Sequence, residues 1–157
     1  MAKETKSIEL NSNVEELYIG EWEAFGWEVL SSQKISNSRV KLTFCRDREL
    51  KNYDELDSRF QRYLMLEDKM KEYAIKKHNL ETEAKPIKVK FNILYAIISI
   101  LFCGIGFIFY LIYFFVANHG YKKDIAKYNE VHAKYEEKYD QLFKESQSIV
   151  NEARTFI

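Results

Sequence analysis

The residues of this chain best suited to metal or nucleophilic chemistry are its three histidines and two cysteines: His78, His119, His132, Cys45 and Cys103. Imidazole nitrogens and thiolates are ligands that zinc prefers in proteins. The histidines lie far apart, however, and no histidine lies near either cysteine in the sequence. No Gly-x-Ser-x-Gly or His-Glu-x-x-His motif occurs. We therefore expect no metal site, and we expect both cysteines to be buried thiols.

Phosphate binding and catalysis by carboxylates are not indicated either. The glycines of Gly104-Ile105-Gly106 stand among apolar residues with no Lys or Ser beside them, unlike a phosphate-binding loop. The carboxylates alternate with lysines in a way that is typical of solvated helix faces. Lys and Arg total 24 and Asp and Glu total 24, so the net charge does not favour nucleic acid. We expect no enzyme activity, no cofactor and no nucleic-acid partner.

Residues 5–47 show the pattern of a small α+β module. Ile8 and Leu10 alternate with polar residues, which predicts a short strand. Apolar residues then follow 3- and 4-residue steps, which predicts a helix that ends at Gly26. Two strands follow, one over residues 27–35 and one in which Val40, Leu42 and Phe44 share a face: the order is β-α-β-β.

One segment of this module has a recognisable sequence motif, Phe25-Gly26-Trp27-Glu28-Val29-Leu30-Ser31, followed by Val40-Lys41-Leu42-Thr43-Phe44. It resembles a family of small uncharacterised bacterial domains built around a Gly-Trp-Glu-Leu-Val-Ser strand. The resemblance implies a compact α+β module without a known activity, and it brings no catalytic residues. We expect Trp27 to be part of the core.

Two long amphipathic helices are predicted on either side of an apolar segment. The first covers residues 52–85: apolar residues keep 3- and 4-residue steps from Tyr53 to Tyr73, and Pro86 marks the end of the helix. Asn118-His119-Gly120 is expected to break the chain before the second helix, over residues 121–156. That helix has a heptad-like seam, formed by Tyr121, Ile125, Tyr128, His132, Tyr135, Tyr139 and Leu142. A seam of this kind indicates that the two long helices pack against each other or against copies in a homo-oligomer.

The segment from Phe91 to Val116 contains no charged side chain and lies in a predicted domain of residues 88–117. As one helix it would be about 39 Å long, enough to span a bilayer. Gly104 and Gly106 lie at its centre and could bend it into a shallow re-entrant hairpin. Lysines flank both ends, so the sequence leaves the single span and the hairpin open.

These patterns predict an α+β module (β-α-β-β) followed by long helices and one membrane-embedded helical segment, mostly α overall. The expected location is the cell membrane, with the lipid bilayer as a partner and the N-terminal module cytoplasmic. The expected function is membrane-anchored interaction or scaffolding, with a homo-oligomer or another protein bound through helices 52–85 and 121–156. Two alternatives remain: a small oligomeric pore-forming or holin-like protein, and an accessory subunit of an enzyme.

Overall fold

The computed structural model describes residues 3–101 and 105–157 of the chain. The protein is 66% helical, with a small three-stranded antiparallel sheet followed by helices. The chain divides into two compact units. Unit 1 comprises Met1–Lys71 and Asp140–Ile157, and unit 2 comprises Glu72–Tyr139.

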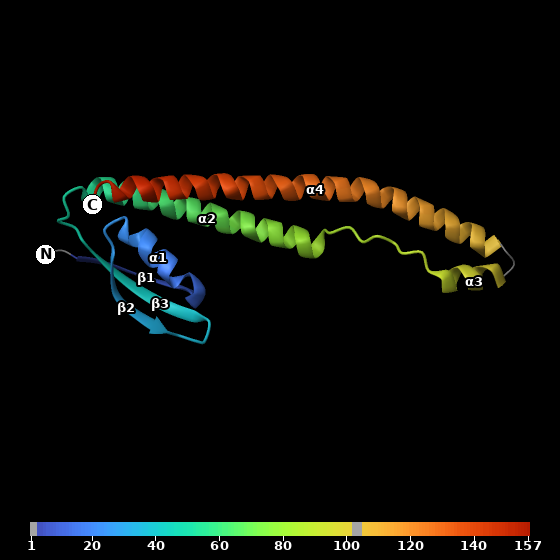
Figure 1. Cartoon of the computed structure of the whole chain (residues 1–157), viewed down its shortest axis with the longest axis horizontal. Helices are drawn as coiled ribbons and strands as arrows, with labels where there is room; N and C mark the ends of the chain where they lie inside the picture. Colours follow the sequence, from blue (N-terminus) through green and yellow to red (C-terminus); the bar gives the residue numbers. More distant parts are fainter. Residues whose placement is uncertain (1–2, 102–104) are drawn as a thin grey trace. The chain divides into compact units, whose positions relative to one another are not determined.

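The sheet belongs to unit 1 and has the strand order β1-β3-β2, with both pairings antiparallel. Strand β1 covers Lys3–Asn11, β2 covers Glu28–Lys34 and β3 covers Arg39–Asp47. A short 3-10 turn, η1 (Ser12–Val14), and helix α1 (Glu15–Glu23) connect β1 to β2. The strands and α1 therefore follow one another in the order predicted for the first module (Figure 1).

Strand β3 lies at the centre of the sheet and holds both edge strands in register. The β1–β3 pairing runs without interruption from Lys3 opposite Asp47 to Asn11 opposite Arg39. The β2–β3 pairing contains an irregularity between Val29 and Ser31. Such a bulge at an edge strand hinders pairing with another chain.

Gly26 connects α1 to β2 in a conformation that favours glycine. Its φ is +79°, in the left-handed region where a side chain would be strained. A Cβ at this position would lie 3.0 Å from Cδ1 of Leu50. The backbone N–H of Gly26 donates to the carbonyl oxygen of Glu23 at 2.9 Å and so closes the end of α1.

The core of unit 1 is rich in aromatic rings. Trp22 of α1 lies against Phe44 of β3 and against Phe60 of a later helix, with ring centroids 4.5 and 4.9 Å apart. Trp27 is 1% exposed, which confirms the prediction that it is a core residue. The C-terminal helical segment completes the cluster with Ile149, Val150 and Ala153.

Two long helices, α2 (Tyr53–Glu83) and α4 (Ile105–Arg154), each contribute residues to both units. Within unit 1 they pair antiparallel (Figure 1). Arg62 donates to Glu145 at 2.6 Å, and the amide of Asn52 donates to the backbone oxygen of Phe156 at 3.0 Å.

The two helices also contact each other within unit 2. The rings of Tyr73 and Tyr135 have centroids 6.1 Å apart, and Lys77 donates to Glu136 at 3.1 Å. In unit 2, then, α2 and α4 contact each other through a ring pair and a charged pair.

Helix α4 passes through the position where the sequence predicts a break. Gly120 lies inside the helix, and a Cβ there would have no heavy atom within 4 Å. The amide of Asn118 donates to the carbonyl oxygen of Phe114 at 2.9 Å, a bond to the preceding turn that a helix accommodates. The predicted break is therefore wrong, because a single helical glycine costs only about 1 kcal/mol.

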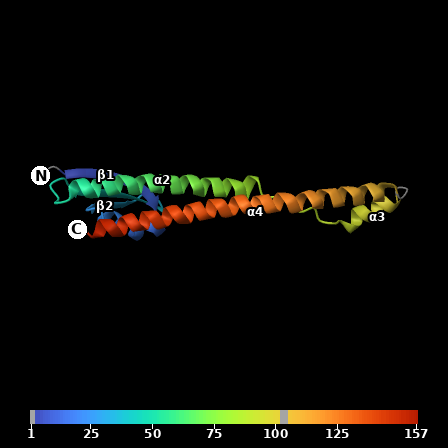
Figure 2. The same ribbon diagram turned by 90° about the horizontal axis from the view of Figure 1, so that it is seen from above.

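The apolar run from Phe91 to Val116 is not one continuous helix. Helix α3 covers Ile93–Leu101, and α4 begins at Ile105. Figure 2 shows α3 beside the first turns of α4, so the chain reverses direction between them. Nine residues of helix are about 14 Å long, and α4 turns polar at Asn118.

The prediction of a membrane-spanning segment is therefore wrong. Within residues 3–101 and 105–157, no helix is both long and apolar enough to cross a membrane. The membrane-embedded part of the predicted fold class and the predicted location in the cell membrane are not supported. The prediction was based on the total length of the apolar run, whereas in the structure this run is divided between the two helices α3 and α4.

Candidate functional site

The predicted helix seam lies on α4, along one helix face. Most of its members are half-buried, and Tyr139 is 39% exposed. The half-buried members are Tyr121, Ile125, Tyr128, His132, Tyr135 and Leu142. Of these, Tyr135 contacts Tyr73 in unit 2, and Leu142 packs on the core of unit 1.

The residues at the ends and at the centre of the apolar segment are Phe91, Val116, Gly104 and Gly106. Phe91 precedes α3, and its ring contacts the rings of Tyr110 and Phe114, each at a centroid distance of 5.5 Å. Val116 is 67% exposed on α4. Gly106 lies in the first turn of α4. Gly104 lies outside the described residues, as does Cys103.

The histidines do not assemble a metal site. In the part of the chain that the structure describes, no group of three or more His, Cys, Asp or Glu could hold a metal ion. Nε2 of His132 lies 2.8 Å from Oε1 of Glu81, and its ring stacks on Tyr128. The hydrogen bond from His132 lowers the pKa of the Glu81 carboxyl. Cys45 is a buried free thiol.

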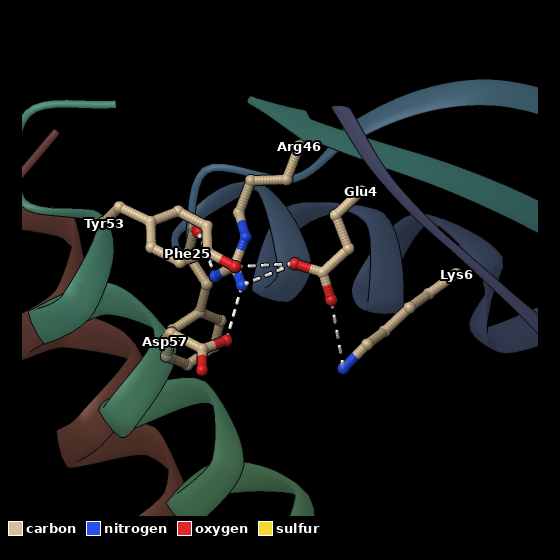
Figure 3. A network of polar contacts seen from close by, with 6 residues as sticks. All are labelled: Glu4, Lys6, Phe25, Arg46, Tyr53 and Asp57. Carbon is tan, nitrogen blue, oxygen red and sulfur yellow. Dashed lines mark hydrogen bonds and ion pairs between the residues drawn. The ribbon is translucent and has the colours of Figure 1, made fainter. Parts of the chain in front are cut away.

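A buried arginine organises the largest polar network of unit 1 (Figure 3). The side chain of Arg46 has no exposed surface, and its Nη2 lies 2.5 Å from Oδ1 of Asp57 and 3.2 Å from Oε2 of Glu4. Its Nη1 donates to the carbonyl oxygen of Phe25 at 3.5 Å. The hydroxyl of Tyr53 donates to the same oxygen of Glu4 at 2.8 Å.

Aromatic rings flank this guanidinium on two sides. Its Cζ lies 4.5 Å from the ring centroids of both Trp27 and Tyr53. Such cation–π contacts gain strength when the cation is removed from water. Charge pairing, hydrogen bonds and ring contacts thus bind Arg46 of β3 to β1, to α2 and to the segment between α1 and β2, which makes it a structural element of the fold rather than an anion-binding group.

We expect the Glu4 carboxylate to make the stability of unit 1 depend on pH. Burial would raise the pKa of Glu4, but the hydrogen bonds from Tyr53 and Arg46 and the charge of Arg46 outweigh it, and the pKa is lowered from 4.5. The stabilisation is then present above 4.5 and is lost as the pH falls through the lowered pKa. Glu4→Gln should therefore be less stable than wild type at neutral pH, with the difference shrinking in acid.

Urea midpoints measured by tryptophan fluorescence at neutral and acidic pH would test this expectation. Glu9→Gln is the matched control, since Glu9 is an exposed carboxylate on the same strand. If the urea midpoints of Glu4→Gln and wild type differed by the same amount at both pH values, the expectation would be contradicted.

A second buried network connects α1, α2 and α4 within unit 1. Glu21 is 8% exposed and accepts hydrogen bonds from Tyr63 at 2.6 Å and from Gln147 at 2.7 Å. Burial and the Glu21 hydrogen bond raise the pKa of Tyr63. The carboxylate therefore links the three helices α1, α2 and α4.

An open groove of about 620 Å³ follows β1. Residues 6–11 form one side, and Tyr18, Trp22 and Leu64 lie on the other. Polar groups at the groove pair with one another: the hydroxyl of Tyr18 donates to Glu67, and Nζ of Lys71 lies 3.0 Å from the same carboxylate. The described lining therefore offers no paired nucleophile and base.

In the apolar segment of unit 2, a few specific contacts connect the start of α3 to α4. Oδ1 of Asn92 accepts from the N–H of Leu94 at 3.0 Å, an N-cap at the start of α3. The N–H of Asn92 donates to the hydroxyl of Tyr110 at 2.8 Å. Together with the ring contacts of Phe91, these bonds fix the entry to α3 against α4. We call residues 91–101 and 105–116 together the apolar hairpin.

Most of the apolar hairpin's large side chains face outward. Those on α4 alternate with more buried neighbours at helical spacing, which gives α4 one exposed apolar stripe. The stripe is formed by Ile108, Phe109, Ile112, Tyr113, Phe115 and Val116, between 54% and 68% exposed. On α3 the exposed side chains are Ile93, Leu94, Tyr95, Ile97 and Ile98. Contiguous apolar surface of this kind typically marks an interaction site.

No family model, curated protein sequence or solved structure matches the chain.

Proposed function

We propose that this chain is an interaction or scaffolding protein whose apolar hairpin binds another protein chain. The observation that carries the proposal is the exposed apolar stripe on α4. The core rings of unit 1, such as Phe25 and Phe60, have no exposed surface, whereas Phe109 of unit 2 is 68% exposed. Leaving such a side chain in water costs on the order of 2 kcal/mol relative to burial.

Two further features support a binding role. The charged groups of the networks around Arg46 and Glu21 pair with residues inside unit 1, which supports a role in the fold. The stripe repeats at the i, i+3/i+4 and i+7 positions by which a helix presents anchors to a groove or to another helix. The absence of enzyme activity and the resemblance of residues 5–47 to the Gly-Trp-Glu-Leu-Val-Ser domains stay predictions.

Photocrosslinking in cells would test the proposal. A photoreactive amino acid in place of Phe109 should form a crosslink to a protein chain, and Val116→Glu in the same chain should abolish that crosslink. Met65, which is 62% exposed on α2 of unit 1, provides the control position. If position 109 formed no protein crosslink, or if position 65 formed the same ones, the proposal would fail.

A further inference from the structure

We infer that the occupant of the stripe is a second copy of this chain, docked stripe to stripe about a two-fold axis. The inference rests on the proposed function and names the partner. Three observations carry it: the size of the exposed surface, its lack of charge, and the electrical neutrality of the whole chain.

The exposed area matches what a stable dimer needs. The outward-facing side chains of α3 and α4 are between 40% and 68% exposed. At on the order of 200 Å² for each large side chain, α3 and α4 together offer roughly 1,300 Å² of surface, of which the six side chains of the stripe offer roughly 750 Å². A specific interface of standard size buries about 800 Å² from each partner, so the stripe supplies most of such an interface and exposed side chains of α3 would supply the rest.

The chemistry of this surface suits an identical partner. No Lys, Arg, Asp or Glu occurs from Phe91 to Val116, so two copies of the stripe place no like charges opposite each other. An isologous interface requires a self-complementary patch, and a uniformly apolar helical stripe meets that requirement. A different partner is commonly selected by charges across the interface, which this surface does not supply.

Long-range electrostatics do not oppose the association. The formal net charge of the chain is +0 at pH 7, so the repulsion that keeps strongly charged proteins apart is absent. Two antiparallel α4 stripes from two copies would bury each other's Phe109 and Val116, as helices do in bundles.

The test measures the mass of the purified full chain by light scattering after gel filtration, over a wide range of concentrations. We expect wild type to have twice the mass of one chain. The variant Phe109→Glu, Val116→Glu should have the mass of a monomer. The matched control is Met65→Glu, Ile75→Glu, which changes two helical side chains of similar exposure, 62% and 61%, and should stay dimeric.

Charge exchange distinguishes a direct contact from loss of folding. The variant Phe109→Lys, Val116→Lys should also be monomeric, but mixing it with the double-Glu variant should restore the dimer, because opposite charges then meet across the interface. Unchanged tryptophan fluorescence in both variants would show that unit 1 is still folded.

A monomeric wild type at every concentration would overturn the inference. So would a monomer that floats with phospholipid vesicles, since a lipid surface would then be the occupant. If the crosslink at position 109 went to a different protein, the proposed function would stand and self-association would fail. If neither a crosslink nor a dimer formed, both would fail.

Discussion

Phe60→Ala should lower the free energy of unfolding of unit 1 by about 4 kcal/mol, as expected for deleting a fully buried ring. Phe60 has no exposed surface. Its ring contacts those of Trp22, Phe25 and Trp27 at centroid distances of 4.9, 5.3 and 5.4 Å. Aromatic neighbours on several sides restrict how far the site can collapse, so most of the cavity will remain.

Urea denaturation followed by tryptophan fluorescence would measure this effect on unit 1 alone. The chain has two tryptophans, Trp22 and Trp27, and both lie in the core of unit 1. Thermal unfolding should show a Tm lower by roughly 15 °C or more. Phe143→Ala is the matched control, since Phe143 is 45% exposed on the unit 1 part of α4. If Phe60→Ala and Phe143→Ala lowered the free energy of unfolding by the same amount, the central role of Phe60 would be contradicted.

Arg46→Met should destabilise unit 1 by about 3 kcal/mol. Removing one partner of a buried ion pair leaves the other charges uncompensated, at a typical cost of about 3–5 kcal/mol. The side chains of Glu4 and Asp57 are 19% and 33% exposed, so water will partly solvate them, and we expect the lower end of that range. The ring contacts with Trp27 and Tyr53 are lost as well.

A combined variant separates the charge effect from the packing effect. Arg46→Met together with Glu4→Gln and Asp57→Asn removes the orphaned charges and should recover part of the lost stability. Arg48→Met is the control, because Arg48 is exposed next to the end of β3, and such substitutions usually change stability by less than about 0.5 kcal/mol. If Arg46→Met proved as stable as Arg48→Met, the network would not contribute to folding.

The sequence predicts those parts of the fold in which apolar residues recur at the regular spacing of a strand or a helix. Val40, Leu42 and Phe44 alternate along the chain, and all three are buried on one face of β3. Arg46 continues the same parity, so the sequence contained a signal that this arginine faces the core. Its partners could not be foreseen, because they lie on β1 and α2, far away along the chain.

The apolar hairpin shows where sequence periodicity gives no guidance. Between Phe91 and Val116 nearly every residue is apolar, so hydropathy indicates removal from water but not the element that covers the surface. A count of apolar residues cannot reveal that α3 and α4 are separate helices; in the sequence, Gly104 and Gly106 were a signal for a hairpin, and they left it open against a single span. Contacts far apart in the sequence define the stripe on α4: Tyr110 and Phe114 lie against Phe91, and the neighbouring apolar side chains stay exposed.

Unit 1 is formed by two separate stretches of the chain, and this has a consequence for synthesis on the ribosome. Ile149, Val150 and Ala153, which close its core, are translated only after all of Glu72–Tyr139. At ~5–20 residues per second, the sheet, α1 and α2 wait on the order of several seconds for that last helical segment. During this interval the aromatic core is partly open while the apolar hairpin emerges, so the nascent chain should depend on chaperones most strongly until Ile149, Val150 and Ala153 have emerged.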